Sequence, residues 1–334
     1  MMRLNNQKIT GFLLERDPEV IAGLFKDADN VRSRYVGNDV HLRGLIEFSN
    51  YCSQNCLYCG LRLGNKAVKR YRMSLDEIYE TVKKAAGLGL KTVVLQSGED
   101  RYYTVKQLCG LVARIKTLGL AVTLSVGELT YSQYKQLRAA GADRYLLRFE
   151  TSDPELYAFL RPGKSLSGRL RCLAWLGKLG YQVGSGAMVG LPGQTAGSIA
   201  DDIVLYKKLD LDMIGIGPFI AHPHTPLAGA AGGSLGLVLK AVALTRILTK
   251  DTNIPATTAV GTVDSKGRQK ALACGANVLM PNMTPAKYRK YYEIYPDKIC
   301  ISEDSIKCTS CVGRMIRSMG RSVAAGHGAR KRKR

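Results

Sequence analysis

A (β/α)8 barrel of the TIM type is the fold that this sequence predicts. Helical and strand patterns alternate along the chain, eight strand patterns occur, and no long Ser, Gly or Pro-rich linker marks a second domain. Repeated strand–helix–strand order implies a parallel sheet, and eight such units favour a closed barrel. The 334 residues, 46% of them apolar, are enough to bury a large core.

The predicted elements follow in chain order. The strands are 42–48, 91–96, 120–126, 144–149, 181–188, 213–217, 254–259 and 277–280. The helices between them are 74–88, 104–118, 131–140, 166–179, 195–209, 235–250 and 265–274. A left-handed C-cap, which glycine adopts at low cost, is expected after five of these helices, at Gly89, Gly119, Gly141, Gly180 and Gly275.

Three regions are expected. Residues 1–38 form two short helices that plug or flank the barrel, 39–296 form the barrel itself, and 297–334 form a C-terminal extension with three cysteines and a basic tail. Active sites of such barrels lie at the C-terminal ends of the strands, so a loop that follows a strand is the place to look for chemistry.

Such a loop follows the first strand and carries Cys52, Cys56 and Cys59 in a C-x3-C-x2-C run. Three thiolates hold three corners of a four-iron cluster and leave one iron without a protein ligand. A catalytic metal needs an open position of this kind. The run therefore indicates an iron–sulfur enzyme that binds a small molecule on iron.

Two simpler interpretations fit less well. A zinc site needs a fourth Cys or His close by, and none follows within forty residues. A disulfide framework is not expected with nine cysteines, an odd number, and no apolar signal peptide at the start. We expect a reducing cytoplasm as the location, and no apolar run approaches the roughly 20 residues of a membrane span.

The formal charge of +22 is high, and nine Lys or Arg and no acid lie in 305–334. Such a segment can hold nucleic acid, an acidic protein or an anionic membrane. No aromatic side chains interleave the final tail 328–334 as stacking platforms would. We therefore expect a solvated tail, with neither nucleic acid nor a membrane as its partner.

The cysteine loop resembles that of the radical S-adenosylmethionine (SAM) superfamily. Further segments resemble the HydE family of [FeFe]-hydrogenase maturases, with methylornithine synthase and biotin synthase as relatives. These segments are 49–62, 96–100, 147–151, 188–195, 215–220 and 255–259, and the resemblance covers 42–314. It implies that SAM chelates the open iron and is cleaved reductively to a 5′-deoxyadenosyl radical.

The resemblance also implies residue roles. Cysteines 52, 56 and 59 ligate the [4Fe-4S] cluster. For SAM it implies Tyr58 near the adenine, Ser97, Gly98 and Glu99 at the ammonium group, Arg148 and Arg169 at the carboxylate, Glu150 at the ribose, and Met213 and Ile216 as walls of the adenine site. Arg148 and Glu150, two apart on a strand, are expected to share one face, although a structural ion pair is the simpler alternative. The simpler alternatives for the others are a surface arginine for Arg169 and ordinary packing for Tyr58, Met213 and Ile216.

Neutral polar side chains at or near strand ends are the candidates for binding substrate: Gln96, Thr123, Thr257, Thr258 and Tyr292. Buried hydroxyls and amides need partners, and a small anionic or cyanide-bearing ligand supplies them. In HydE-like enzymes the implied substrate is a small Fe(CO)2(CN)–cysteine-type species made by the companion maturase HydG. The implied partners also include HydF and an electron donor such as flavodoxin or ferredoxin.

A second cysteine set, Cys300, Cys308 and Cys311, also resembles HydE, some members of which hold an auxiliary [2Fe-2S] or [4Fe-4S] cluster there. It speaks against methylornithine synthase. The remaining cysteines fall in predicted helices and are interpreted as core residues. His222 and His224 flank a proline, so we expect a turn with exposed rings. The segment 190–193 lacks the lysine of a phosphate loop and is interpreted as structural.

Two other functions stay open at this point. One is a radical SAM amino-acid mutase of the methylornithine synthase type, which keeps the cluster and changes the pocket. The other is an iron–sulfur or zinc protein that binds nucleic acid through the basic tail.

Overall fold

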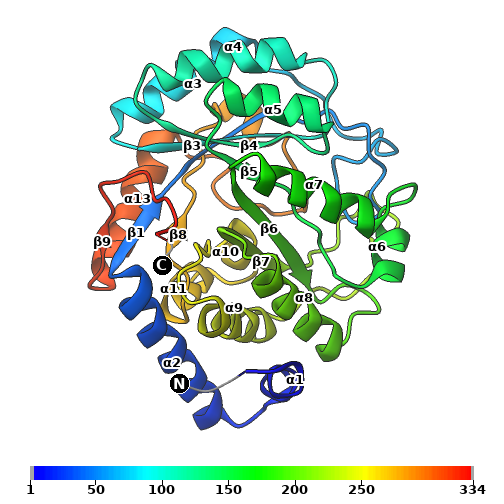
Figure 1. The fold of residues 1–334 in the computed structure, drawn as a ribbon, viewed down its shortest axis with the longest axis vertical. Helices are drawn as coiled ribbons and strands as arrows, with labels where there is room; N and C mark the ends of the chain where they lie inside the picture. Colours follow the sequence, from blue (N-terminus) through cyan, green and yellow to red (C-terminus); the bar gives the residue numbers. More distant parts are fainter. Residues whose placement is uncertain (1–3, 332–334) are drawn as a thin grey trace.

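A ring of parallel strands forms the centre of the molecule, with helices outside it (Figure 1). The computed structural model describes residues 4–331. Six strands pair in sequence order, each parallel to the next, as repeated strand–helix–strand units require. They are β2 (Gly44–Ser49), β3 (Thr92–Ser97), β4 (Ala121–Ser125), β5 (Arg144–Leu146), β6 (Gln182–Val189) and β7 (Met213–Pro218).

The first strand of the ring has two parts, β1 (Asp39–Leu42) and β2, so it begins earlier than predicted. The backbone of this first strand is hydrogen-bonded to the last strand. Arg43 N donates to Leu279 O at 3.0 Å, and Leu45 N donates to Pro281 O at 2.9 Å. β8 (Val278–Leu279) pairs with β1. These bonds join the two ends of the sheet and close the barrel.

The prediction of a regular strand at 254–259 is wrong. This stretch makes only isolated parallel bridges, from Asn253 to Met213 and from Pro255 to Val278. Pro255 has no N–H to donate to a ladder, and a helix already begins at Thr258. The two bridges nevertheless fill the seventh position of the ring.

The predicted helices between the strands are confirmed. Thr104 and Thr130 begin two of them with capping boxes, in which the cap side chain and the third helical residue exchange hydrogen bonds. The helices after the first strand are α3 (Leu75–Gly87), α4 (Val105–Lys116), α5 (Tyr131–Ala139), α6 (Pro154–Leu160), α7 (Leu166–Lys178), α8 (Ala196–Lys208), α9 (Leu235–Thr249), α10 (Thr258–Val263) and α11 (Gly267–Ala273). The five glycines expected at C-caps all have positive φ.

Two helices precede the barrel, α1 (Asn6–Leu14) and α2 (Pro18–Val36). α1 packs on α8 and α2 packs on α9, so both flank the barrel from outside (Figure 1). With 19 residues, α2 is longer than the short helix that we expected. No helix in residues 4–331 has the length and apolar character to cross a membrane.

After the ring the chain forms α12 (Ala286–Arg289), α13 (Ser305–Ser318) and β9 (Ser322–Val323), which pairs with β1. Residues 324–330, which we call the C-terminal strap, then cross the N-terminal end of the barrel. His327 O accepts hydrogen bonds from Thr92 and Arg144, at the starts of β3 and β5, both at 2.8 Å. Gly328 O accepts from Arg43 at 3.1 Å and Asn253 at 3.2 Å.

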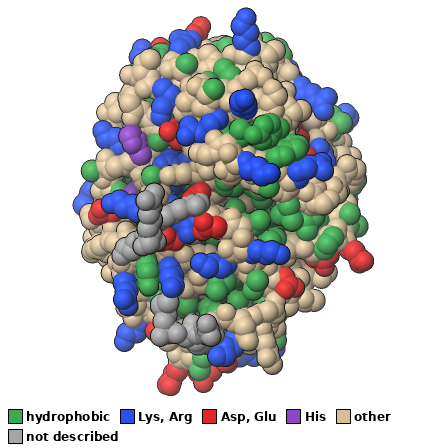
Figure 2. Space-filling view, in the orientation of Figure 1, with side chains coloured by type: hydrophobic (Ala, Val, Ile, Leu, Met, Phe, Trp, Pro, Cys, Tyr) green, Lys and Arg blue, Asp and Glu red, His purple; other side chains and the backbone are tan. Residues whose placement is uncertain are grey.

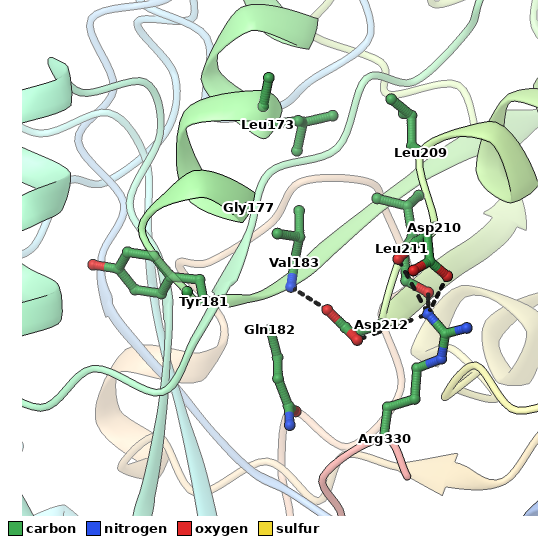
Figure 3. Close-up of a pocket in the computed structure, with 12 residues that line it drawn as sticks. Leu173, Gly177, Tyr181, Gln182, Val183, Leu209, Asp210, Leu211, Asp212 and Arg330 are labelled. Carbon is green, nitrogen blue, oxygen red and sulfur yellow. Dashed lines mark hydrogen bonds and ion pairs between the residues drawn. The ribbon is translucent and has the colours of Figure 1, made fainter. Parts of the chain in front are cut away.

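Arg330 anchors the end of the strap. Its side chain is 6% exposed, and it forms ion pairs of 2.8 Å with Asp251 and with Asp210, the second of which is drawn in Figure 3. The expectation of a solvated tail is therefore wrong for Arg330. It is not tested for residues 332–334, which lie outside the described residues. Elsewhere on this face lysine and arginine side chains are spread out rather than gathered in one patch (Figure 2).

We predict that Arg330→Ala lowers the free energy of unfolding by about 1–3 kcal/mol, because it removes charge-assisted bonds from partly buried carboxylates. Chemical denaturation of the metal-free protein measures this loss. Lys331→Ala is the matched control, since the Lys331 side chain is exposed. Equal stability of the two variants would contradict an anchoring role for Arg330.

Candidate active site

The three-cysteine loop lies at the C-terminal end of β2. Cys52, Cys56 and Cys59 all line a cavity of about 350 Å³ inside the barrel, a volume in the range of small-molecule sites. The cavity passes down the barrel from this loop to Arg43, which contacts the strap at the opposite end. The sequence prediction of a cysteine site at the barrel mouth agrees with this placement.

The distances between the thiols of Cys52, Cys56 and Cys59 indicate whether they can bind a single metal ion or a larger cluster. In the described part of the chain, the one group of three ligating side chains whose ligand atoms all lie within 4.8 Å of one another is Cys300, Glu303 and Cys308. At least one pair of thiol sulfurs in the loop is therefore farther apart than 4.8 Å, whereas thiolates on a single tetrahedral ion, at a bond of about 2.3 Å, lie roughly 4 Å apart. A cluster several atoms wide fits this spacing better than one zinc ion.

Burial raises the pKa of Cys52 and, more strongly, the pKa of Cys59, whose thiol also faces the other two cysteines. A metal binds the thiolate, so loading of this site releases protons and is favoured as pH rises.

Arg70 braces the cysteine loop. Its guanidinium donates to four backbone carbonyl oxygens, listed by residue and distance as Asn50 at 2.5 Å, Leu61 at 3.0 Å, Arg62 at 2.9 Å and Asn65 at 3.2 Å. These carbonyls lie before and after the three cysteines, so one cation fixes both ends of the loop. Burial lowers the pKa of Arg70, and the thiols of Cys52 and Cys59 oppose that shift.

The end of β3 approaches the loop closely at Gly98. A Cβ atom there would lie 2.2 Å from Tyr51 O and 2.7 Å from Cys52 Cβ, so only glycine fits. Glu99 N donates to Cys52 Sγ at 3.4 Å. Tyr58, Ser97, Gly98 and Glu99, which the sequence assigned to SAM, all line the cavity.

Arg148 and Glu150 form an ion pair of 3.0 Å at the cavity wall. Both side chains face the cavity, in agreement with the expectation of a shared face, although regular pairing of β5 ends at Leu146 and Glu150 has a φ of 66°. This left-handed backbone is uncommon for a residue other than glycine and turns the carboxylate towards Arg148. Nε of Arg148 is buried without a hydrogen-bond acceptor in the described residues, and Nη2 makes only the ion pair with Glu150 Oε2, which lacks hydrogen-bond geometry.

Arg169, the second candidate for the SAM carboxylate, is 2% exposed, so a surface arginine is excluded. It pairs with Glu128 at 3.1 Å and donates to Tyr157 OH at 3.2 Å. Its Nη2 also lacks a hydrogen-bond acceptor among the residues described. The buried guanidinium of Arg169 and the partly buried one of Arg148, whose side chain is 29% exposed, thus offer N–H donors to a ligand in the cavity.

The two residues expected to wall the adenine are placed differently. Met213 is the first residue of β7, at the floor of the cavity, where Arg43 contacts its sulfur at 2.7 Å. Ile216 is 1% exposed and packs in the main core, while its neighbours Gly215 and Gly217 line the cavity. Strand alternation places Met213 on the same face as Gly215 and Gly217, towards the cavity, and Ile216 on the opposite face, so the assignment of these two residues to the adenine stays a prediction.

Four of the five predicted substrate residues line the cavity: Gln96, Thr123, Thr257 and Thr258. Tyr292 lies behind Gln96, which donates to its hydroxyl at 3.2 Å. Thr123 Oγ1 is buried without a partner in the described chain. A ligand in the cavity can satisfy this orphaned hydroxyl.

Sequence reasoning missed four charged residues of the cavity: Arg43, Glu47, Arg161 and Lys298. Lys298 forms a buried ion pair with Glu47, whose other oxygen accepts from Asn282 at 3.1 Å. Arg43 and Glu47 carried a usable signal, since charges inside an otherwise apolar strand require partners. Lys298 had no such local signal.

Only two of the three C-terminal cysteines lie close together. Cys300 and Cys308 lie together with Glu303, while Cys311 is exposed and stands outside this group. Arg268 approaches Cys300 Sγ at 3.9 Å. Cys172 and Cys274 are buried as core residues, and Cys109 packs partly buried against the core.

The histidine turn differs from the expectation in one respect. His224 is exposed, but His222 is 2% exposed because its ring packs against Gly60 in the cysteine loop. The turn at 190–193 is structural as interpreted, since Gln194 Oε1 accepts from Gly190 N at 2.7 Å.

Comparisons with known proteins bear on this geometry. A family model described as the Radical SAM superfamily matches residues 46–206. The [FeFe] hydrogenase maturase subunit HydE of Thermotoga maritima is 54% identical over 309 residues, which span 92% of this chain and 89% of that protein. The chain belongs to the HydE family. It is therefore a radical SAM enzyme of hydrogenase maturation, as the resemblance predicted.

More distant relatives share the fold. The 3-methylornithine synthase of Methanosarcina acetivorans is 32% identical, over 83% of this chain and 79% of that protein. A crystal structure of methylornithine synthase (PylB) superimposes with a TM-score of 0.84 and 28% identity, covering 97% of this chain and 95% of that one. These matches confirm the predicted barrel of the radical SAM kind.

A buried carboxyl joins two loops at the mouth. Asp202 accepts from Ser152 N at 2.5 Å, just after Glu150, and from Gln194 Nε2 at 3.4 Å. Burial raises its pKa to about 7, and the bonds from Ser152 oppose that shift. Asp202 therefore holds the loop that carries Glu150 against the turn after β6.

We predict that Arg70→Met lowers the iron bound after anaerobic reconstitution and the free energy of unfolding by about 2 kcal/mol, since four loop carbonyls lose their donor. Iron analysis and denaturation measure these effects. Lys66→Met, an exposed change in the same loop, is the control. Normal iron content in Arg70→Met would count against bracing of the loop.

We predict a pH signature for Asp202. Because its folded pKa is raised to about 7, its stabilising contribution is complete below about pH 4 and is lost as pH rises towards 7. Asp202→Asn removes this loss. The free energy of unfolding of the wild type minus that of the variant should fall between pH 4 and 7 and level off above, and a flat difference would refute the shift.

Proposed function

We propose that this enzyme binds a [4Fe-4S] cluster through Cys52, Cys56 and Cys59, cleaves SAM reductively, and acts on a small Fe(CO)2(CN)–cysteine-type species during assembly of the H-cluster. The observation that carries the proposal is the convergence of three cysteines and two incompletely paired arginines on one barrel cavity. Identity to a HydE subunit supports the pathway. The iron-bearing substrate itself rests on the family resemblance.

The residues present fit a cluster with one open iron. Three thiols line the cavity at wide spacing, and the Gly98 backbone leaves room where a side chain would not fit. When bound, the cluster supplies one electron to the sulfonium of SAM. A flavodoxin or ferredoxin in a reducing cytoplasm fits as the donor of that electron.

The chain's own groups then bind and orient SAM. Arg148 and Arg169 offer buried N–H donors for a carboxylate, and such charge-assisted bonds are strong in a low-dielectric cavity. Glu150 suits ribose hydroxyls, and Tyr58 lies beside the cysteines for the adenine. Apolar surface elsewhere in the cavity excludes water from the reaction.

Polar groups deeper in the barrel fit a small anionic or cyanide-bearing substrate. Thr123 Oγ1 lacks a partner in the described chain, and Gln96, Thr257 and Thr258 lie on the same cavity. The substrate fits a product of HydG, and HydF fits as the protein that receives the next intermediate. The lower identity to methylornithine synthase, 32% against 54%, disfavours the amino-acid mutase.

We further propose that the C-terminal cysteines hold an auxiliary [2Fe-2S] or [4Fe-4S] cluster that is dispensable for turnover. Cys300, Cys308 and Glu303 offer three ligands within 4.8 Å of one another, and Cys311 is exposed. The division into helices 1–38, barrel 39–296 and extension 297–334 also stays a prediction.

We predict that Cys56→Ser abolishes production of 5′-deoxyadenosine, because it removes one of the three ligands that hold the cluster. The assay uses anaerobically reconstituted protein, dithionite and SAM, with and without the synthon from HydG. Cys109→Ser, away from both cysteine sets, is the matched control. Normal 5′-deoxyadenosine formation by Cys56→Ser would contradict the cluster assignment, and an absence of stimulation by the synthon would contradict the proposed substrate.

A further inference from the structure

A third arginine of the cavity stands beside the cysteine loop and is not among the residues assigned to SAM. Arg161 is the C-cap residue of α6, and its side chain is 8% exposed and lines the cavity. The residue before it is tied to the loop, since Leu57 N, next to Cys56, donates to Leu160 O at 2.9 Å. The backbone that carries Arg161 is therefore fixed relative to the cysteines.

The charge of Arg161 is weakly neutralised. Its one carboxylate contact in the described chain is to Glu99 Oε1 at 3.5 Å, beyond ordinary hydrogen-bond length. Its Nε is buried without a partner in the same residues. By comparison, Arg169 meets Glu128 at 3.1 Å and Lys164 meets it at 2.8 Å.

The electrostatic neighbours of Arg161 belong to the cluster loop. Burial acts to lower its pKa, but Tyr58 and Cys56 are the largest of the opposing influences, and the resulting pKa is raised. Glu99, its weak partner, is held by Gln54 of the loop at 2.8 Å and donates its own amide to Cys52. The cation is thus oriented by the same segment that carries the thiols.

We propose that Arg161 sets the reduction potential of the cluster, as a positioning residue that acts on it electrostatically. This inference rests on the proposed function, because it requires a cluster on Cys52, Cys56 and Cys59. Reduction by a low-potential one-electron donor adds one negative charge to a site that three thiolates already make anionic. A buried cation stabilises the reduced form more than the oxidised form, and the effect is large where solvent screening is weak.

The test measures the midpoint potential of the reconstituted cluster without SAM, by titration with dithionite and redox dyes monitored by EPR. Omission of SAM separates tuning of the cluster from binding of the SAM carboxylate. Arg161→Gln should shift the potential to lower values, with about a tenfold smaller reduced-to-oxidised ratio at a fixed potential, which is 59 mV for one electron. Arg161→Lys should recover most of the wild-type value, because it keeps the charge.

Two further variants check the cause. Lys164→Gln removes a neighbouring cation that Glu128 already neutralises and whose side chain is 29% exposed, so it should leave the potential near that of the wild type. Glu99→Gln removes the carboxylate beside Arg161 and should shift the potential in the opposite direction, to higher values. Opposite signs at Arg161 and Glu99 are expected from electrostatics and not from general loosening of the site.

The inference is overturned if Arg161→Gln holds a normal cluster at the wild-type potential. It is also overturned if Arg161→Gln loses the cluster while Arg161→Lys and Glu99→Gln keep it at an unchanged potential, since Arg161 would then be structural. Failure of the proposed function looks different, because the wild-type protein itself would then show no reducible [4Fe-4S] signal.

Discussion

Charge buried inside the barrel needs partners, and the rest of the structure depends on where those partners come from. A guanidinium group carries five N–H donors and keeps its charge, so each buried arginine demands acceptors. This chain meets that demand differently at the two ends of the barrel. As a result, the strap covers the N-terminal end of the barrel, while the C-terminal end keeps N–H donors that a bound ligand can use.

At the N-terminal end the chain supplies most of the acceptors itself, although Arg43 Nε is buried without a hydrogen-bond partner in the described residues. The C-terminal strap lays the carbonyls of His327 and Gly328 under Arg144 and Arg43, and Arg330 holds the strap in place. At the C-terminal end Arg70 is satisfied by the carbonyls of the cysteine loop and thereby shapes it. Three arginines that line the cavity at this end, Arg148, Arg161 and Arg169, have buried N–H groups without a hydrogen-bond acceptor in the described chain. The cavity is thus prepared for anionic groups at its mouth.

Much of this architecture could be predicted from the sequence because its signals are local. The C-x3-C-x2-C run, the alternation of helix and strand, and glycines after helices each depend on neighbouring residues. The misses are non-local. Lys298 meets Glu47 across 251 positions, and Arg330 meets Asp251 across 79. Pro255 interrupts a strand that hydrophobicity alone favoured, and the burial of His222 depends on a contact with Gly60. Met213 and Ile216 were assigned by likeness, and that assignment stays a prediction.

The central claim is that the cysteine loop holds a cluster with one open iron, to which SAM binds directly. Electron–nuclear double resonance on the reduced, reconstituted protein with SAM isotope-labelled at its amino nitrogen and carboxylate tests this most directly. The account predicts hyperfine coupling between the cluster and both labels. This coupling should be absent from the Cys56→Ser variant. A reduced cluster that shows no coupling to either label would contradict it.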